Sequence, residues 1–193
     1  MTSAFTITTD EIVVTRARAG DLEALESVYR TFEVPVFNLA RRLCRNSEDA
    51  EDVMQETFIE VMRSIHRFRG DGPLAGWIRR VAASKALMKL RRGRARMTEA
   101  LDEDLGDPAT GSASASGWLS GLSHDRIDLD TALSTLSDTA RSVVWLHDVE
   151  GYTHEEIAEL MERTPSFSKS QLARAHGRLR RCLTTARDKE EEV

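Results

Sequence analysis

Four carboxylates recur three or four residues apart in one segment of the chain: Asp49, Asp52, Glu56 and Glu60. At that spacing side chains share one face of a helix, and paired carboxylates can hold a metal ion or exchange a proton. The sequence offers no facing histidine cluster, no Ser/His/Asp or Cys/His set and no Gly-rich phosphate loop. We therefore predict no catalytic residue, no metal and no cofactor, and interpret the acidic stripe as a docking surface or a solvated face.

A second segment, Gly76–Arg96, is basic and contains no carboxylate, although the net charge of the whole chain is −5. Its basic residues are Arg79, Arg80, Lys85, Lys89, Arg91, Arg92, Arg94 and Arg96. Such a local concentration of positive charge favours binding to nucleic-acid phosphates. The alternatives are a solvated cationic face or a helix end that neutralises the acidic stretch after it. Trp77 could stack on an exposed base, or it could belong to the core.

The segment Thr153–Arg181 has the pattern of a helix-turn-helix with a basic second helix. Thr153 and Glu156 have the spacing of a capping box, and Thr164 followed by Pro165 signals the start of a second helix. In such motifs the second helix enters the major groove of DNA. If Leu172 and Ala175 face inward, the residues that face outward are Lys169, Ser170, Ala173 and Arg174. The alternative is a solvated face that binds no ligand.

Arg174 could bond a guanine edge or a phosphate, because a guanidinium matches both geometries. Lys169 and Arg178 are expected to hold phosphates.

The remaining periodicity predicts an all-α protein, since no segment alternates as a strand does. A helical pattern starts at Asp21, with Pro35 expected to break or kink it, and Ser47 is expected to cap the next helix. The apolar side predicted for that helix is Ala50, Val53, Met54, Phe58, Val61, Met62 and Ile65. A loop, Arg69–Ala75, leads to the basic helix, which we expect Trp77 to open.

A change of composition divides the chain into two small helical domains, 19–97 and 126–185. The segment between them, 98–125, is acidic and then rich in Gly and Ser, so it is predicted to be a flexible linker. In the second domain, Ser137 is expected to cap a helix and Gly151 to stop one, and the last helix is expected to bury Leu172, Ala175, Leu179 and Leu183. Residues 1–18 are predicted to be an extension without fixed structure, and 186–193 a charged tail.

The composition of the 193 residues excludes several classes of protein. Only two cysteines occur, Cys44 and Cys182, and neither has a Cys or His at metal-ligand spacing. A disulfide scaffold or zinc site is therefore not expected, and the cytoplasm is the simplest setting. No apolar run reaches the roughly 20 residues of a membrane helix, and the first residues lack the pattern of a secretion signal.

The motifs QETF (55–58), FRGD (68–71) and WIRRVA (77–82) resemble region two of the extracytoplasmic-function sigma factors, which are bacterial transcription initiation factors. The stretch LSDTARSVVWLHDVEGYTHEEIAELM (136–161), with SKSQLARAHGRLRR (168–181), resembles region four of the same family. Both matches occur in the family's order and are joined by a linker.

The resemblance implies binding to core RNA polymerase and to promoter DNA, both as duplex and as melted strand. It assigns polymerase docking to Asp49, Asp52, Gln55 and Glu56. It assigns a flipped base of the minus-ten element to the loop with Phe68, Arg69, Gly70 and Asp71, and the melted strand to Trp77, Arg80, Ser84, Lys85, Met88, Arg91 and Arg92. It assigns the minus-thirty-five element to His147, His154, Ser166, Phe167, Lys169, Ser170, Ala173, Arg174 and Arg178. An anti-sigma factor is a further expected partner.

The chain departs from the family pattern at several of these positions. Ser84 and Met88 stand where polar residues, often Asn at the first, are usual, which could change readout of the minus-ten element. The turn 162–167 lacks the usual glycine and a buried Ile. Phe167 could contact a thymine methyl group or fill the core.

Two other functions compete with this prediction. A helix-turn-helix regulator that binds duplex DNA without polymerase would account for Thr153–Arg181 but not for the acidic and basic helices. A helical adaptor that binds only proteins would show no salt-dependent affinity for DNA.

Overall fold

A computed structural model describes the backbone of residues 3–101 and 131–190, and the side chains of residues 3–95 and 131–183. Within these ranges the chain is helical and contains no strand, which confirms the predicted all-α class. The chain divides into two compact units, Met1–Ala100 and Leu101–Val193. The proposed linker lies outside the described residues except for 98–101, whose backbone is helical.

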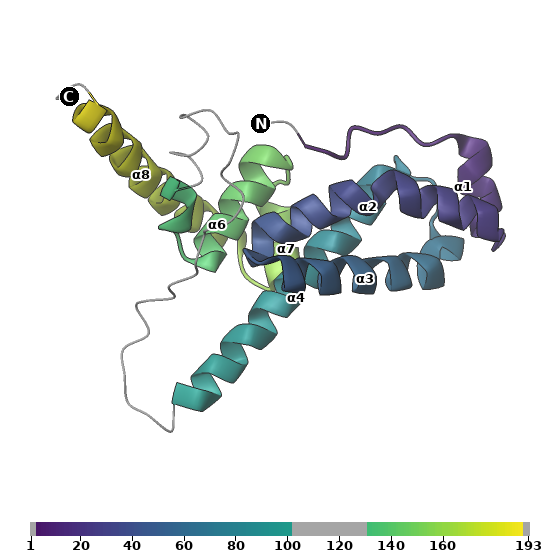
Figure 1. The fold of residues 1–193 in the computed structure, drawn as a ribbon, viewed down its shortest axis with the longest axis horizontal. Helices are drawn as coiled ribbons and strands as arrows, with labels where there is room; N and C mark the ends of the chain where they lie inside the picture. Colours follow the sequence, from purple (N-terminus) through teal and green to yellow (C-terminus); the bar gives the residue numbers. More distant parts are fainter. Residues whose placement is uncertain (1–2, 102–130, 191–193) are drawn as a thin grey trace. The chain divides into compact units, whose positions relative to one another are not determined.

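The first unit is built around α2 (Leu22–Cys44) and α3 (Ser47–Ser64), which lie side by side (Figure 1). The Asp21 side chain caps α2 by accepting a hydrogen bond from the Ala24 amide. A short 3-10 turn, η1 (Ile65–Arg67), follows α3, and an exposed loop then leads to α4 (Leu74–Leu101). The core contains one side of each helix, with Phe32, Leu39, Val53 and Ile78 almost fully buried.

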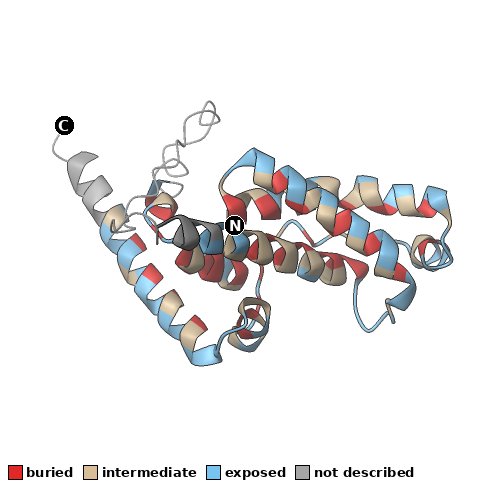
Figure 2. Ribbon diagram, turned by 90° about the horizontal axis from the view of Figure 1, so that it is seen from below, coloured by how far each residue is buried: buried red, intermediate tan, exposed pale blue. Residues whose placement is uncertain are grey.

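The second unit contains α6 (Asp138–Val144), a π-helical turn η2 (Trp145–Val149), α7 (His154–Met161) and α8 (Pro165–Glu190). Both α6 and α7 pack on α8. The cap signals act as predicted: Ser137 caps α6, and Thr153 with Glu156 forms a complete capping box on α7. Figure 2 shows buried and exposed residues alternating along α8, so this helix presents one face to the unit and another to solvent.

The N-terminal extension is not without structure, contrary to the prediction. Residues Glu11–Arg18 form α1, which Asp10 caps through the Ile12 amide. Ala17 is fully buried, and α1 packs on α2 and on η1. Phe5 is also buried, with its ring stacked on that of Phe32 at 6.4 Å between centroids. An eight-residue helix with one buried residue gives too little periodicity to be found in the sequence.

Two local features of the first unit differ in part from the prediction, which allowed a break or a kink at Pro35 and placed the cap of α3 at Ser47. The chain does not break at Pro35, because α2 continues through it with Val36, Leu39 and Leu43 buried beyond it. Burial of that side outweighs the cost of about 3 kcal/mol for a proline inside a helix. The cap of α3 is Asn46 rather than Ser47, with the Asn46 side chain accepting from the Asp49 amide at 2.7 Å.

Other boundaries also differ from the prediction. The basic helix starts at Leu74, so Trp77 lies in its first turn, and α8 continues to Glu190 through part of the proposed tail. Leu172, Ala175 and Leu179 are buried as expected, but Leu183 is 37% exposed. These errors arise because burial at a helix end depends on neighbouring elements rather than on spacing alone.

The turn of the helix-turn-helix is built without a glycine. Glu162 ends α7 in the left-handed conformation, with φ 55° and ψ 47°. That conformation costs a non-glycine residue about 1–2 kcal/mol. Glu162, at a position where the resemblance led us to expect glycine, therefore makes the turn at a cost in backbone strain.

We expect Glu162→Gly to stabilise the second unit by about 0.5–1 kcal/mol, because relief of the strain exceeds the extra entropy that glycine loses on folding. Native-state hydrogen exchange of the α7 and α8 amides measures this gain. Glu162→Ala is the matched control and should bring no gain, since alanine keeps the Cβ. Equal stabilisation by both variants would show that loss of the carboxylate, not backbone strain, is responsible.

Candidate nucleic-acid interface

One face of α4 carries most of the residues predicted to hold melted DNA. The opposite side is buried through Ile78, Ala82, Ala83, Ala86 and Leu87. At 100° per residue, the positions opposite this buried side are Trp77, Arg80, Ser84, Met88 and Arg91. These side chains are exposed or half-buried, so the fold gathers five of the predicted residues into one row. Lys85 and Arg92 lie on the flank of the same helix.

The loop before α4 presents polar backbone to solvent beside an aromatic pair. Arg69, Gly70 and Asp71 are exposed, and Gly70 takes φ +82°, which the absence of a side chain permits. The rings of Phe68 and Trp77 are 5.6 Å apart and tilted. Both are half-buried, so Trp77 is held by the protein and still reaches the surface.

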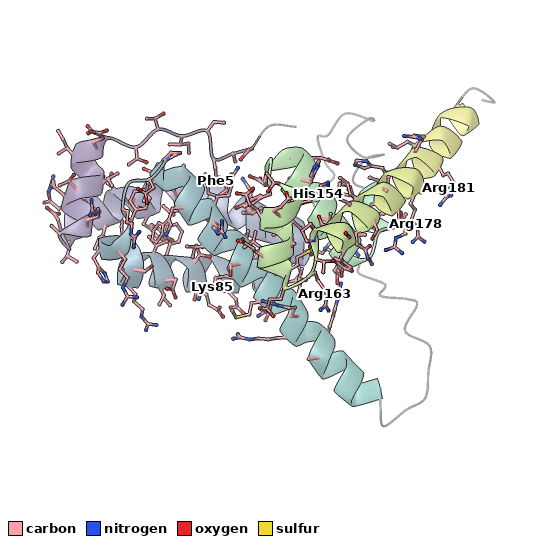
Figure 3. All side chains as sticks on the ribbon, turned by 180° about the vertical axis from the view of Figure 1, so that it is seen from behind. Phe5, Lys85, His154, Arg163, Arg178 and Arg181 are labelled. Carbon is pink, nitrogen blue, oxygen red and sulfur yellow. The ribbon has the colours of Figure 1, made fainter. Side chains whose placement is uncertain are left out.

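The sequences of α3 and α4 suggested two separate surfaces, one acidic and one basic. In the structure the two surfaces are in contact. Lys89 Nζ lies 2.9 Å from Asp49 Oδ1 and 2.8 Å from Asp52 Oδ2. Lys85 Nζ lies 3.3 Å from Glu60 Oε2. The predicted DNA residue Lys85 and the predicted polymerase residues Asp49 and Asp52 are therefore engaged across the α3–α4 boundary (Lys85 is labelled in Figure 3).

Asp49 is the most constrained member of the stripe. Its Oδ2 atom accepts from Asn46 Nδ2 at 2.7 Å, while its Oδ1 faces Lys89. The hydrogen bond from Asn46 is the largest cause that lowers the pKa of Asp49, with Lys89 adding to it against the effect of burial. Asp49 therefore holds the start of α3 and its junction with α4.

We expect Asn46→Ala to destabilise the first unit by about 1 kcal/mol at neutral pH, because α3 loses its cap. Part of this loss depends on ionised Asp49. A lowered pKa contributes stability above the unfolded value of about 3.9, and that contribution is lost as pH falls through the folded value. The measured cost should therefore be smaller at about pH 3 than at pH 7.

Urea unfolding at both pH values checks this, with Asn38→Ala, an exposed site within α2, as the control. A cost that does not change with pH would show that Asn46 acts on the backbone alone.

The outward face of α3 also carries apolar side chains that the sequence assigned to the core or passed over. Met62 is 48% exposed, contrary to the prediction that it is buried, and Ile59 is 49% exposed. Both lie within seven residues of Gln55 on the same side of the helix. An apolar pair beside carboxylates has the composition of a protein interface.

The exposed side of α8, which we call the recognition face after its predicted role, has the arrangement predicted from its sequence. Ser166, Lys169, Ser170, Ala173, Arg174 and Arg178 are all exposed. The Arg174 guanidinium bonds back to Ser170, at 3.2 Å from its carbonyl and 3.3 Å from its hydroxyl. Figure 3 shows Arg178 and Arg181 along this helix, and Arg163 in the turn before it. The face is polar and basic over several turns.

Phe167 does not fill the core, because it is only half-buried at the first turn of α8. The Arg163 guanidinium lies over its ring, 5.9 Å from the centroid. The amide of Phe167 donates to Thr164, which caps the helix as the sequence predicted. The aromatic side chain therefore lies at the edge of the recognition face.

Histidines that are scattered in the sequence meet in the second unit. The rings of His147 and His154 stack at 4.7 Å, and His154 Nδ1 lies 3.0 Å from the hydroxyl of the buried Ser168. Asp148 contacts His147 at 2.8 Å and His176 at 2.6 Å. Burial raises the pKa of Asp148, but the two histidine contacts outweigh burial and the net shift is downward. The cluster ties η2, α7 and α8 together.

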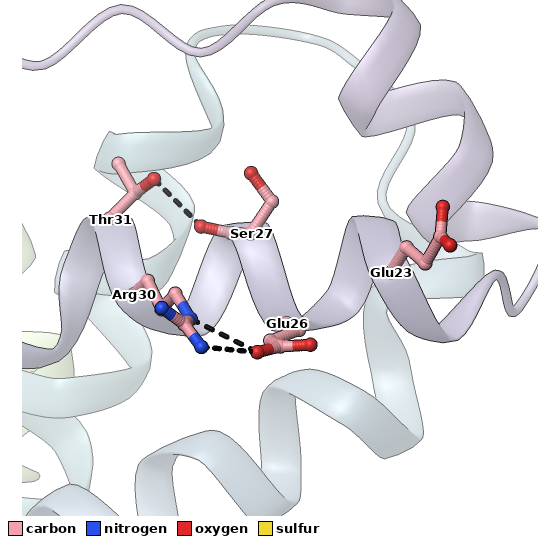
Figure 4. Close-up of a pocket in the computed structure, with 5 residues that line it drawn as sticks. All are labelled: Glu23, Glu26, Ser27, Arg30 and Thr31. Carbon is pink, nitrogen blue, oxygen red and sulfur yellow. Dashed lines mark hydrogen bonds and ion pairs between the residues drawn. The ribbon is translucent and has the colours of Figure 1, made fainter.

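One open hollow lies on α2, lined by Glu23, Glu26, Ser27, Arg30 and Thr31 (Figure 4). Arg30 pairs with Glu26 there at 2.6 Å. In the part of the chain with described side chains, no group of His, Cys, Asp and Glu could hold a metal ion. Among the described helices, none is both long and apolar enough to span a membrane.

Both units match known family models. Residues 28–96 match sigma-70 region 2, and residues 126–179 match sigma-70 region 4. A helical unit of the first kind followed by a helix-turn-helix unit of the second kind defines a sigma factor of the sigma-70 class.

Sequence identity to individual sigma factors shows which family within this class the chain belongs to. The chain is 31% identical over 165 residues to the ECF RNA polymerase sigma factor SigM of Mycobacterium tuberculosis, covering 86% of this chain and 80% of SigM. It is 33% identical over 168 residues to the RNA polymerase sigma factor CarQ of Myxococcus xanthus, covering 87% and 94%. The chain belongs to the extracytoplasmic-function family of sigma factors.

Solved structures share the fold. The sigma factor RpoE of Bartonella quintana, crystallised with the anti-sigma factor NepR, superposes with a TM-score of 0.57 at 21% identity, over 82% of this chain and 96% of that one. CnrH, in complex with the cytosolic domain of CnrY, gives a TM-score of 0.55 at 21% identity, over 91% and 97%.

Proposed function

We propose that this chain binds core RNA polymerase and directs it to promoters as a non-enzymatic initiation factor. The observation that supports this most strongly is the presence of a basic, solvent-facing helix in each of two units: α4 beside an exposed loop, and α8 in a helix-turn-helix. Two such surfaces suit DNA in two states, melted strand and duplex. The cytoplasm, where polymerase acts, is the proposed location.

The outward face of α3 is the proposed polymerase contact. Asp49 also accepts a hydrogen bond from Asn46 and is 36% exposed, whereas Asp52 is 53% exposed and contacts only Lys89 among the contacts described. We therefore assign the larger part of docking to Asp52, Gln55 and Glu56, whose side chains lie together on the outward face. The exposed Ile59 and Met62 extend this face and supply the apolar area that a stable interface needs.

The loop at Gly70 and the first turns of α4 are the proposed minus-ten contact. Flipping a base out of a duplex costs a few kcal/mol, and stacking on an aromatic ring returns about 1–3 kcal/mol per base. Trp77, held by Phe68 at the edge of the loop, is placed to supply such stacking. Arg80, Ser84, Met88 and Arg91 then line the path of the strand along α4.

The exposed face of α8 is the proposed minus-thirty-five contact. Arg174 and Lys169 reach the groove, while the histidine cluster positions α7 and α8 and sets His147 and His154 toward the backbone of the DNA. An anti-sigma factor, as NepR is in its complex with RpoE, is proposed to cover these surfaces.

The decisive experiment is transcription from a promoter library by purified core polymerase with and without this protein. We expect new transcripts with defined start sites. Duplex binding without any transcript would favour the regulator, and loss of all salt-dependent DNA affinity would favour the protein adaptor.

A further inference from the structure

Lys89 is basic and lies on α4, but it is not among the residues predicted to bind DNA. It shares a flank of the helix with Lys85 and Arg92, at intervals of four and three residues. This row runs between the outward row that starts at Trp77 and the acidic stripe of α3. Lys89 is therefore at the border of the proposed strand contact and the proposed polymerase contact.

Two carboxylates hold Lys89 at this border. Its Nζ atom is 2.8 Å from Asp52 Oδ2 and 2.9 Å from Asp49 Oδ1. The hydrogen bonds to Asp52 and then to Asp49 raise the pKa of Lys89, so the ammonium stays charged. The side chain is nevertheless 31% exposed, and Asp52 is 53% exposed. The pair is open to competing charges from solvent or from a partner.

We propose that Lys89 is a phosphate-binding residue for the melted strand, and that Asp52 masks it until polymerase docks. The inference rests on the proposed function, because it joins the two surfaces assigned there. When basic groups of polymerase pair with Asp52, Asp52 no longer pairs with Lys89. The lysine, a point charge on a flexible four-carbon stem, then turns to the phosphates passing along α4.

The strength of the contact fits such an exchange. Ion pairs at an exposed surface change an equilibrium by about 1.4- to 5-fold each. A partner that offers a second cation to Asp52 and a phosphate to Lys89 can therefore replace the internal pair without unfolding the helices. Lys85 and Glu60, at 3.3 Å, form a second and longer contact of the same kind.

The first test compares Lys89→Gln with the wild type in two states, the full chain alone and the full chain with core polymerase. The probe is a fluorescein-labelled oligothymidylate strand at low salt. We expect the substitution to change affinity little in the chain alone and to weaken it about twofold to fivefold in the complex. Arg92→Gln, on the same row and exposed, should weaken binding in both states. An equal loss for Lys89→Gln in both states, or no loss in either, overturns the proposal.

The second test removes the mask in the chain alone. Asp52→Asn keeps the shape of the side chain and should tighten binding of the same strand by about twofold to fivefold. Glu51→Gln makes the same change of net charge on an exposed neighbour and measures the general effect. If Asp52→Asn binds no more tightly than Glu51→Gln, Asp52 does not mask Lys89.

Failure of the inference is distinguishable from failure of the proposed function. Wild-type chain that yields promoter-specific transcripts with polymerase establishes the function whatever Lys89 does. Thermal unfolding of Lys89→Gln and Asp52→Asn, expected close to the wild type, shows that the binding changes do not come from a damaged fold.

Discussion

Reversing the charge of Asp52 and Glu56 together, as Asp52→Lys with Glu56→Lys, is expected to weaken association with core RNA polymerase by about 100-fold. Like charges brought together across an interface cost several kcal/mol, and each 1.4 kcal/mol is a factor of ten. Both side chains lie on the outward face of α3, beside the exposed Ile59 and Met62. Titration of labelled protein with core polymerase measures the change.

The lysine introduced at position 52 would lie beside Lys89, which Asp52 contacts at 2.8 Å in the wild type. The repulsion between these two lysines could weaken binding by itself, so a control is needed. Glu56→Lys alone avoids that repulsion and should still cost about tenfold. Glu51→Lys is the matched control, because it is exposed on the same helix but rotated by about 100° from Asp52. Duplex affinity of the second unit should match that of the control. Polymerase affinity equal to the wild type would exclude this face as the docking surface.

Replacing Arg174 by alanine is expected to lower affinity for promoter duplex by about 1–3 kcal/mol, roughly 5- to 150-fold. The guanidinium lies on the exposed face of α8, where two hydrogen bonds to Ser170 hold the side chain in one conformation. That arrangement reduces the conformational entropy lost when it meets DNA. The measurement uses the full chain and a promoter identified by transcript mapping.

The form of the loss separates two roles of Arg174. If it reads a guanine, the variant should tolerate other bases at one position. If it holds a phosphate, affinity should fall equally on all sequences, and the salt slope should drop by about one. Arg30→Ala, which removes an exposed arginine from the first unit, should leave duplex affinity within about twofold. Equal losses for both variants would mean that Arg174 contributes only net charge.

Signals contained within one or two turns could be predicted from the sequence. The capping box at Thr153, the start at Thr164 and Pro165, and the inward side of α8 all have the predicted geometry. Such features depend on residues three or four positions apart, so the sequence contains both partners. The outward row of α4 from Trp77 to Arg91 was not predicted in this way, because it became visible only when the buried side of the helix was known.

Features that join distant segments could not be predicted in this way. The helix α1 is stabilised by packing on α2. Phe5, which precedes α1, stacks on Phe32, a residue far along the chain. Met62 is exposed because, among the described residues of the first unit, no other helix packs on that side of α3. The gathering of His147, His154 and His176 likewise needs three elements brought together.

By itself, the sequence determined that this protein is all-α, that its two helical units resemble the sigma-factor regions two and four, and which side of α8 faces outward. Tertiary structure alone decided that Lys89 meets Asp52, 37 residues away, so that the acidic and basic helices share a border. The physical reason is that helical periodicity fixes direction around one axis, whereas the pairing of charges depends on how two axes pack.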